Sequence, residues 1–124
     1  MIPGDTFLPG APGAHLNIVA AGPCAHGQIL VVKVTADDEP SQDGSCLLAV
    51  GDHPYLSKPS RIAYWDDALY LEALGDAAVV RGDLKPMTRV SADLLARIVA
   101  GYRISRDARP LRRRFATGGQ CACP

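Results

Sequence analysis

The chain lacks the features that would place it in a membrane or mark it for export. None of its apolar runs approaches the roughly 18 residues that suggest a transmembrane helix. The N-terminal stretch MIPGDTFLPG has neither the basic region nor the apolar core of a signal peptide. We therefore expect a protein that acts in the cytoplasm and has no membrane partner.

Common enzyme motifs are missing as well. The chain contains no phosphate-binding loop of the Walker type and no glycine-rich dinucleotide fingerprint. It also contains no H-E-x-x-H motif and no G-x-S-x-G motif. These absences argue against the enzyme classes that carry such motifs, and we expect no cofactor.

Cysteine is scarce, with four residues in 124. Cytoplasmic chains rarely hold structural disulfides. Cys24 with His26, and Cys121 with Cys123, offer four possible zinc ligands, but both pairs lack the usual spacers of two to four residues. We therefore predict no metal site. Cys46, in the apolar stretch SCLLAV, is expected to be a small core residue.

The formal net charge is zero, but the charges are unevenly distributed. Residues 1–96 carry 12 acidic and 6 basic side chains, whereas residues 97–124 carry 7 basic and 1 acidic. We expect a domain over 1–104 followed by an arginine-rich, flexible tail over 105–124. The tail either binds phosphates or an acidic partner, or is solvated and balances the acidic body.

Short apolar stretches separated by glycine- and proline-rich links indicate a mainly β domain, a small antiparallel barrel or sandwich. The predicted strands are 5–9, 15–21, 28–36, 45–51 and 60–65. Residues 66–80 fit either a helix or a strand, and a strand is favoured for 68–73. A helix is predicted over 91–105, because Ser91 is a good N-cap and apolar residues follow at helical spacing.

Candidate site residues occur at the ends of these strands. His15 and His53 have the side chain best suited to proton transfer near neutral pH, although either histidine can equally be structural. Lys33 and Thr35 share one strand face, where Lys33 points either to solvent or to an anion. Arg61 has the planar group that grips a phosphate.

Further contacts with RNA are expected around the stretch GDHPYLSKPS, which spans 51–60. Lys58 and Ser60 bring an ammonium and a hydroxyl group to it. Tyr55, Tyr64 and Trp65 are aromatic groups on which bases can stack. The alternative for Tyr64 and Trp65 is a place in the core and at its rim, and we prefer that alternative for Trp65.

Five of these stretches, in this order, resemble the MazF/PemK family of toxins from toxin–antitoxin systems. They are PGDTF, HLNIVAA, ILVVKVTADD, KPSRIAY and RVSADLLARIVAGY, and together they span residue 3 to about residue 103. The resemblance implies a small SH3-like antiparallel barrel of the CcdB/PemK type with a C-terminal helix. It also implies a homodimer that is neutralised by a cognate antitoxin protein.

The resemblance implies a metal-independent endoribonuclease that cleaves single-stranded mRNA. Thr35 matches the strand-end threonine of the family, and His15 lies about where the family has an arginine. His15, Thr35, Arg61 and His53 are the implied catalytic set, and Lys33, Lys58, Ser60 and Tyr64 the implied RNA contacts. The missing arginine favours an alternative, which is a non-catalytic module on the same barrel that binds a protein target such as a topoisomerase, or a nucleic acid.

Overall fold

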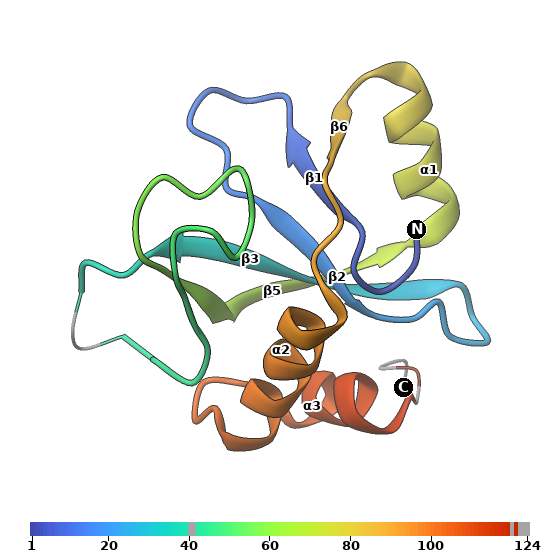
Figure 1. The fold of residues 1–124 in the computed structure, drawn as a ribbon. Coiled ribbons are helices and arrows are strands. Elements are labelled where there is room, and N and C mark those ends of the chain that lie inside the picture. The colour runs from blue at the N-terminus through green and yellow to red at the C-terminus, as the bar shows by residue number, and fades with distance from the viewer. Residues whose placement is uncertain (40–41, 120, 122–124) are drawn as a thin grey trace.

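A curled antiparallel sheet, shaped like half a barrel, forms the body of the protein (Figure 1). The computed structural model describes residues 1–39, 42–119 and 121. The strand order in the described residues is β4-β5-β3-β2-β1-β6. The strands are β1 Thr6–Pro9, β2 Asn17–Ala21, β3 Gln28–Ala36, β4 Leu47–Leu48, β5 Ser60–Leu71 and β6 Leu84–Met87, and the helices are α1 Glu72–Arg81, α2 Ala92–Ile104 and α3 Pro110–Gly118.

The central strand β3 is apolar on both of its faces. Leu30, Val32 and Val34 point into the main core, which α2 and α3 cover. Ile29 and Val31 point to the other face, where they pack in a smaller cluster with Phe7. Side chains alternate between the faces of a strand, so burial of both faces explains the unbroken apolar run that starts this strand.

Residues 66–80 divide between a strand and a helix. Strand β5 continues to Leu71, which pairs with Gln28 of β3, so the expected strand at 68–73 is confirmed up to that residue. Helix α1 then runs from Glu72 to Arg81 and is capped by Gly82, whose left-handed conformation suits glycine. None of the residues of α1 is buried. The pairing of β5 with β3 therefore determines where β5 ends.

The predicted helix at 91–105 is confirmed as α2. The Ser91 hydroxyl accepts a hydrogen bond from the backbone N–H of Leu94, as expected for an N-cap. Leu94, Ile98 and Tyr102 are buried against the sheet. Cys46 is buried in the same core, as predicted.

The expectation of a flexible tail over 105–124 is wrong for the described part of it. Helix α3 begins with Pro110, because proline is well suited to the first position of a helix. Phe115 is 1% exposed and belongs to the main core. Arg113 donates to the carbonyl oxygens of Tyr102 and Ser105, at 2.7 and 2.6 Å, and so caps the end of α2.

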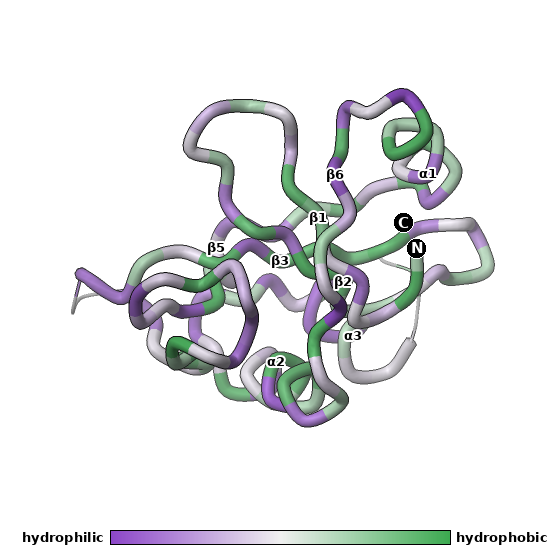
Figure 2. Tube along the Cα trace, turned by 45° about the horizontal axis from the view of Figure 1, so that its top comes forward, coloured by the Kyte–Doolittle hydropathy of each residue, from purple (hydrophilic) through white to green (hydrophobic). Residues whose placement is uncertain are grey.

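One hydrophilic stretch lies at an edge of the molecule. Figure 2 shows the hydrophilic stretch at 37–39 projecting from one edge, away from the apolar middle of the sheet. In the described residues, no helix has the length and apolar character needed to cross a membrane.

Candidate functional site

A pocket lies where the chain enters β2, leaves β3 and turns toward β5. Its volume is about 210 Å³. Four of the predicted site residues line it: His15, Thr35, Lys58 and Ser60. The lining is completed by Ala14, Leu16, Val34, Ala36, Tyr55, Leu56 and Ser57. The described lining residues include no carboxylate.

The exposed imidazole of His15 is held in one orientation. Its Nδ1 lies 3.1 Å from the carbonyl oxygen of Val34. A carbonyl oxygen can only accept a hydrogen bond, so Nδ1 carries the proton. In the neutral ring, Nε2 therefore keeps its lone pair and is able to take a proton from a ligand. Asn17 fixes the backbone here by donating to the carbonyl oxygen of His15 at 2.8 Å.

Thr35 and Lys58 come to the pocket from different segments, β3 and the turn before β5. Thr35 is half-buried at the end of β3, opposite Arg61 of β5 in the sheet register. Lys58 is exposed. The buried Ser60 hydroxyl donates to the carbonyl oxygen of Lys58 at 3.0 Å. Since its donor is already in use, Ser60 holds the turn that presents Lys58, and the predicted direct contact of Ser60 with RNA loses its support.

Tyr55 is a pocket residue that the sequence reasoning considered only as a surface for base stacking. Its phenol donates to the carbonyl oxygen of Ala14 at 3.1 Å, beside His15. The position of this tyrosine in a turn between Pro54 and Pro59 was the available signal, but pairing with residue 14 is visible only in the fold.

His53 does not line the pocket, and its geometry contradicts the catalytic role expected for it. The ring is 2% exposed. Its Nε2–H donates to the carbonyl oxygen of Thr88 at 2.6 Å, and its Nδ1 accepts from the backbone N–H of Tyr55 at 3.0 Å. Both nitrogens are used, so His53 is a structural residue that positions the turn carrying Tyr55.

Arg61 is also withdrawn from the pocket. Its side chain is 5% exposed and forms an ion pair with Asp37. One guanidinium nitrogen also donates to the carbonyl oxygen of Gln42 at 2.6 Å. These bonds tie the loop after β3 to β5. The predicted role of Arg61 in gripping a phosphate is therefore contradicted, because the guanidinium is buried and already paired.

Two of the predicted RNA contacts lie elsewhere. Tyr64 is fully buried in the core, and its hydroxyl donates to the carbonyl oxygen of Ile98 at 2.7 Å. Burial rules out stacking on a base, so this prediction is wrong. Lys33 lies outside the pocket, and its ammonium group is 3.3 Å from the carboxylate of Asp66. The anion that Lys33 faces is thus part of the protein.

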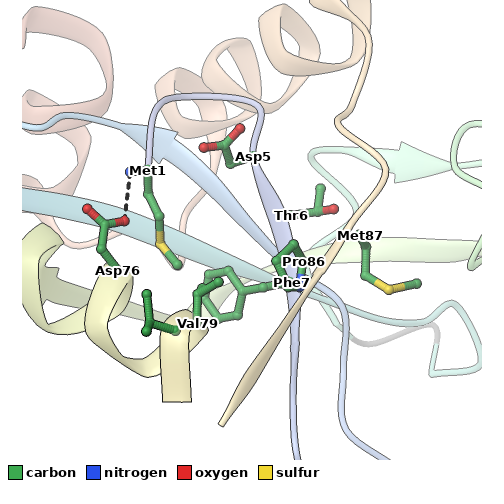
Figure 3. Close-up of a pocket in the computed structure, with 9 residues that line it drawn as sticks. Met1, Asp5, Thr6, Phe7, Asp76, Val79, Pro86 and Met87 are labelled. Atoms are coloured by element: carbon green, nitrogen blue, oxygen red, sulfur yellow. Dashed lines mark hydrogen bonds and ion pairs between the residues drawn. The ribbon is translucent and has the colours of Figure 1, made fainter. Parts of the chain in front are cut away.

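A larger pocket of about 400 Å³ lies between α1, β1 and β6. Figure 3 shows Met1, Phe7 and Val79 converging in it. Its polar groups are already engaged, since the amino group of Met1 contacts Asp76 at 3.1 Å and the Thr6 hydroxyl donates to the carbonyl oxygen of Thr88 at 2.7 Å. This pocket offers apolar surface and no proton-transfer group comparable to His15.

Three possible metal ligands also lie together, and none of them lines either pocket. The ligand atoms of Cys24, His26 and Cys121 lie within 4.8 Å of one another. Cys24 and Cys121 form a disulfide, a pairing that the sequence pattern did not predict. Cys123 lies outside the described residues.

Comparisons with known proteins do not assign a function to the chain, so the proposal below rests on the geometry of the pocket. No family model, no curated protein and no solved structure matches the chain.

Proposed function

We propose that this chain is a toxin of the MazF/PemK type, an SH3-like barrel that cleaves single-stranded RNA in the cytoplasm without a metal. The observation that carries the proposal is the orientation of His15. Its Nε2 lone pair is available beside Lys58 and Thr35, in a pocket without a described carboxylate. A base, a cation and a hydroxyl donor are what the attack of a ribose 2′-hydroxyl on a phosphodiester requires.

In the proposed reaction, Nε2 of His15 takes the proton of the 2′-hydroxyl, and the 2′-oxygen forms a bond to phosphorus. The ammonium of Lys58 and the hydroxyl of Thr35 stabilise the negative charge on the phosphorane oxygens. The bond from phosphorus to the 5′-oxygen breaks, and this oxygen takes up a proton from solvent. The products are a 2′,3′-cyclic phosphate and a 5′-hydroxyl end.

The decisive experiment follows RNA after expression of the chain and, in parallel, with the purified protein in the presence of a chelator. We expect growth arrest, fragmented mRNA and fragments with cyclic phosphate ends. His15→Ala should slow cleavage by about 100-fold or more, the usual contribution of a general base. An RNA whose cleavage site carries 2′-deoxyribose should resist.

Lys58→Ala should weaken cleavage as well, because it removes the cation of the pocket. Lys85→Ala is the matched control, since Lys85 is an exposed lysine on β6, away from this pocket. Equal cleavage by His15→Ala and the unaltered protein would refute the proposal.

One observation favours a second candidate, a binding module on the same barrel with a protein target. Arg61 is sequestered by Asp37, so Lys58 is the one permanent cation among the described lining residues. A single exposed ammonium group holds a phosphate weakly. Growth arrest with intact mRNA would support this second candidate against the nuclease.

The proposal includes a homodimer and a cognate antitoxin. An extended acidic segment of the antitoxin would occupy the pocket around Lys58, which has the charge to receive it. Light scattering on the purified chain should give twice the mass of 13.1 kDa. A monomer at micromolar concentration would contradict the dimer.

A further inference from the structure

The β2–β3 hairpin carries a second cluster of reactive side chains at its closed end. His15 and Thr35 lie at the open end of this hairpin, whereas Cys24 and His26 lie in the turn at 22–27 that closes it (Figure 1). Backbone hydrogen bonds hold the turn. The N–H of Cys24 donates to the carbonyl oxygen of Gln28 at 3.0 Å, and the N–H of Gly27 donates to the carbonyl oxygen of Cys24 at 2.9 Å. Cys24 and His26 are therefore presented on a fixed frame.

The third member of the cluster arrives from the other end of the chain. Cys121 follows α3, and Phe115 of α3 is buried in the main core. The Sγ of Cys121 lies 3.2 Å from Nδ1 of His26 and is bonded to the Sγ of Cys24. The two cysteines are 97 residues apart in sequence, with their Cα atoms 5.5 Å apart.

We propose that, when the two thiols are reduced, Cys24, His26 and Cys121 bind a zinc ion, and that the disulfide is the oxidised, metal-free form of the same site. Two thiolates and one imidazole are the donors that zinc prefers. Zinc–sulfur bonds of about 2.3 Å and zinc–nitrogen bonds of about 2.0 Å place tetrahedral ligand atoms roughly 3.5–3.8 Å apart. The three ligand atoms already lie within 4.8 Å of one another.

The fit needs little rearrangement of the backbone. Opening the disulfide lets the two sulfur atoms separate, and Nδ1 of His26 already faces the sulfur of Cys121. His26 is exposed, so the fourth position is open to a water molecule or to another donor. Either bond, to sulfur or to zinc, ties the segment after α3 to the turn before β3.

The exchange between the two forms balances with an oxidant of the peroxide class. The two zinc-bound thiolates lose two electrons and form the sulfur–sulfur bond. One hydrogen peroxide takes up these electrons with two protons and becomes two water molecules, and the zinc ion is released. A dithiol reverses the oxidation, after which zinc rebinds.

The test uses the full chain, reduced by a phosphine and then titrated with Zn²⁺ against a chromophoric chelator, and in parallel with Co²⁺. We expect one equivalent of metal and the absorption bands of tetrahedral cobalt bound to thiolate. Cys24→Ser, His26→Gln and Cys121→Ser should each weaken binding by about 100-fold or more, because loss of even an outer-shell partner of a metal ligand costs about 10- to 100-fold. Cys46→Ser is the matched control, because Cys46 is a buried free thiol outside the cluster. It should bind metal as the unaltered chain does.

Two further measurements test zinc binding without relying on RNA cleavage, and they separate loss of binding from loss of folding. Zinc should raise the melting temperature of the reduced chain but not that of the His26→Gln variant. Peroxide should release the zinc and leave a chain that is two hydrogen atoms lighter than the metal-free dithiol. Binding that survives Cys24→Ser and His26→Gln but needs Cys121 and Cys123 would overturn the proposal. A folded, reduced chain that takes up no metal would also overturn it.

Discussion

The histidines illustrate how local bonding divides residues that look equivalent in the sequence. His15 is exposed, and one of its ring nitrogens forms a hydrogen bond with the carbonyl oxygen of Val34. His53 is buried, and both of its ring nitrogens form hydrogen bonds, with the carbonyl oxygen of Thr88 and the N–H of Tyr55. Of these two histidines, only His15 retains a free lone pair for chemistry. His53 serves the site indirectly, since it shapes the turn that carries Tyr55 and Lys58.

This difference predicts opposite effects on stability at the residue scale. His53→Ala removes one of the two donors to the carbonyl oxygen of Thr88, which Thr6 also contacts, and leaves the N–H of Tyr55 without its acceptor. It should therefore lower the free energy of unfolding by about 1–3 kcal/mol. His15→Ala should change it by less than about 0.5 kcal/mol, because the ring is exposed. Urea unfolding of both variants measures the two changes in the free energy of unfolding. A destabilisation of His15→Ala as large as that of His53→Ala would contradict the assignment.

At the scale of elements, α2 and β5 come into unusually close contact. The ring of Tyr64 packs edge-on against Tyr102, with 4.7 Å between ring centres, and the Tyr64 hydroxyl donates to the carbonyl oxygen of Ile98. A methyl group on Gly101 would overlap that hydroxyl. Burial raises the pKa of the Tyr64 phenol well above its usual range. The glycine therefore sets how closely the helix approaches the strand.

Gly101→Ala should lower the free energy of unfolding by about 1–3 kcal/mol, the usual cost of overpacking, despite the better helix propensity of alanine. Ala100→Ser is a control on the exposed side of the same helix. Thermal melting of both variants distinguishes them. A Gly101→Ala variant as stable as the parent would mean that α2 moves away from β5 at little cost.

A second contact between elements joins the loop before β4 to the end of α2. The buried carboxylate of Asp43 accepts hydrogen bonds from the hydroxyls of Ser105 and Ser45. Burial alone would raise the pKa of Asp43, but the hydrogen bonds from Ser105 and then Ser45 outweigh it and lower the pKa. The folded state therefore favours the ionised form.

The sign of the pH dependence follows from that lowered pKa. Asp43 contributes its full stabilisation above the unfolded pKa of about 3.9, and the contribution is lost as the pH falls through the lower folded value. Asp43→Asn should thus be about 1–3 kcal/mol less stable than the parent at pH 7, and this gap should shrink below about pH 4. Urea unfolding at a series of pH values measures the gap. A gap that stays constant would contradict the role of the carboxylate.

At the scale of the whole molecule, the basic end of the chain neutralises the acidic body. Arg112 of α3 lies 2.7 Å from Asp67 of β5, whose side chain is fully buried. Tyr102 donates to the same carboxylate at 2.7 Å. Arg97 lies 3.4 Å from Asp52. The uneven charge along the sequence therefore serves folding at these positions, which corrects the expectation of a flexible, solvated tail at Arg112.

Arg112→Ala should destabilise the fold by about 3–5 kcal/mol, because it leaves the buried carboxylate of Asp67 without its cation. Arg114→Ala, on the exposed side of α3, should change stability by less than about 0.5 kcal/mol. Denaturant unfolding compares the two. Equal effects would show that the helix is held by Phe115 alone.

Local patterns were sufficient to predict several elements. The limits of β3 and the N-cap of α2 followed from the apolar run and from Ser91. His15, Thr35 and Lys58 were selected individually, and the fold brings them to one pocket. The predictions for Arg61 and Tyr64 were wrong. The sequence around a polar side chain does not show whether the fold will place a distant carboxylate or carbonyl oxygen within hydrogen-bonding distance of it.

The sequence by itself determined the mainly β character, the apolar centre of the sheet and the capped helix α2, since these depend on neighbours within a few residues. Tertiary structure alone decided which histidine keeps a free nitrogen, where α3 docks, and that Cys24 meets Cys121. Each of these depends on contacts between segments that lie tens of residues apart. Such pairings depend on the packing of the entire chain, and local periodicity does not encode them.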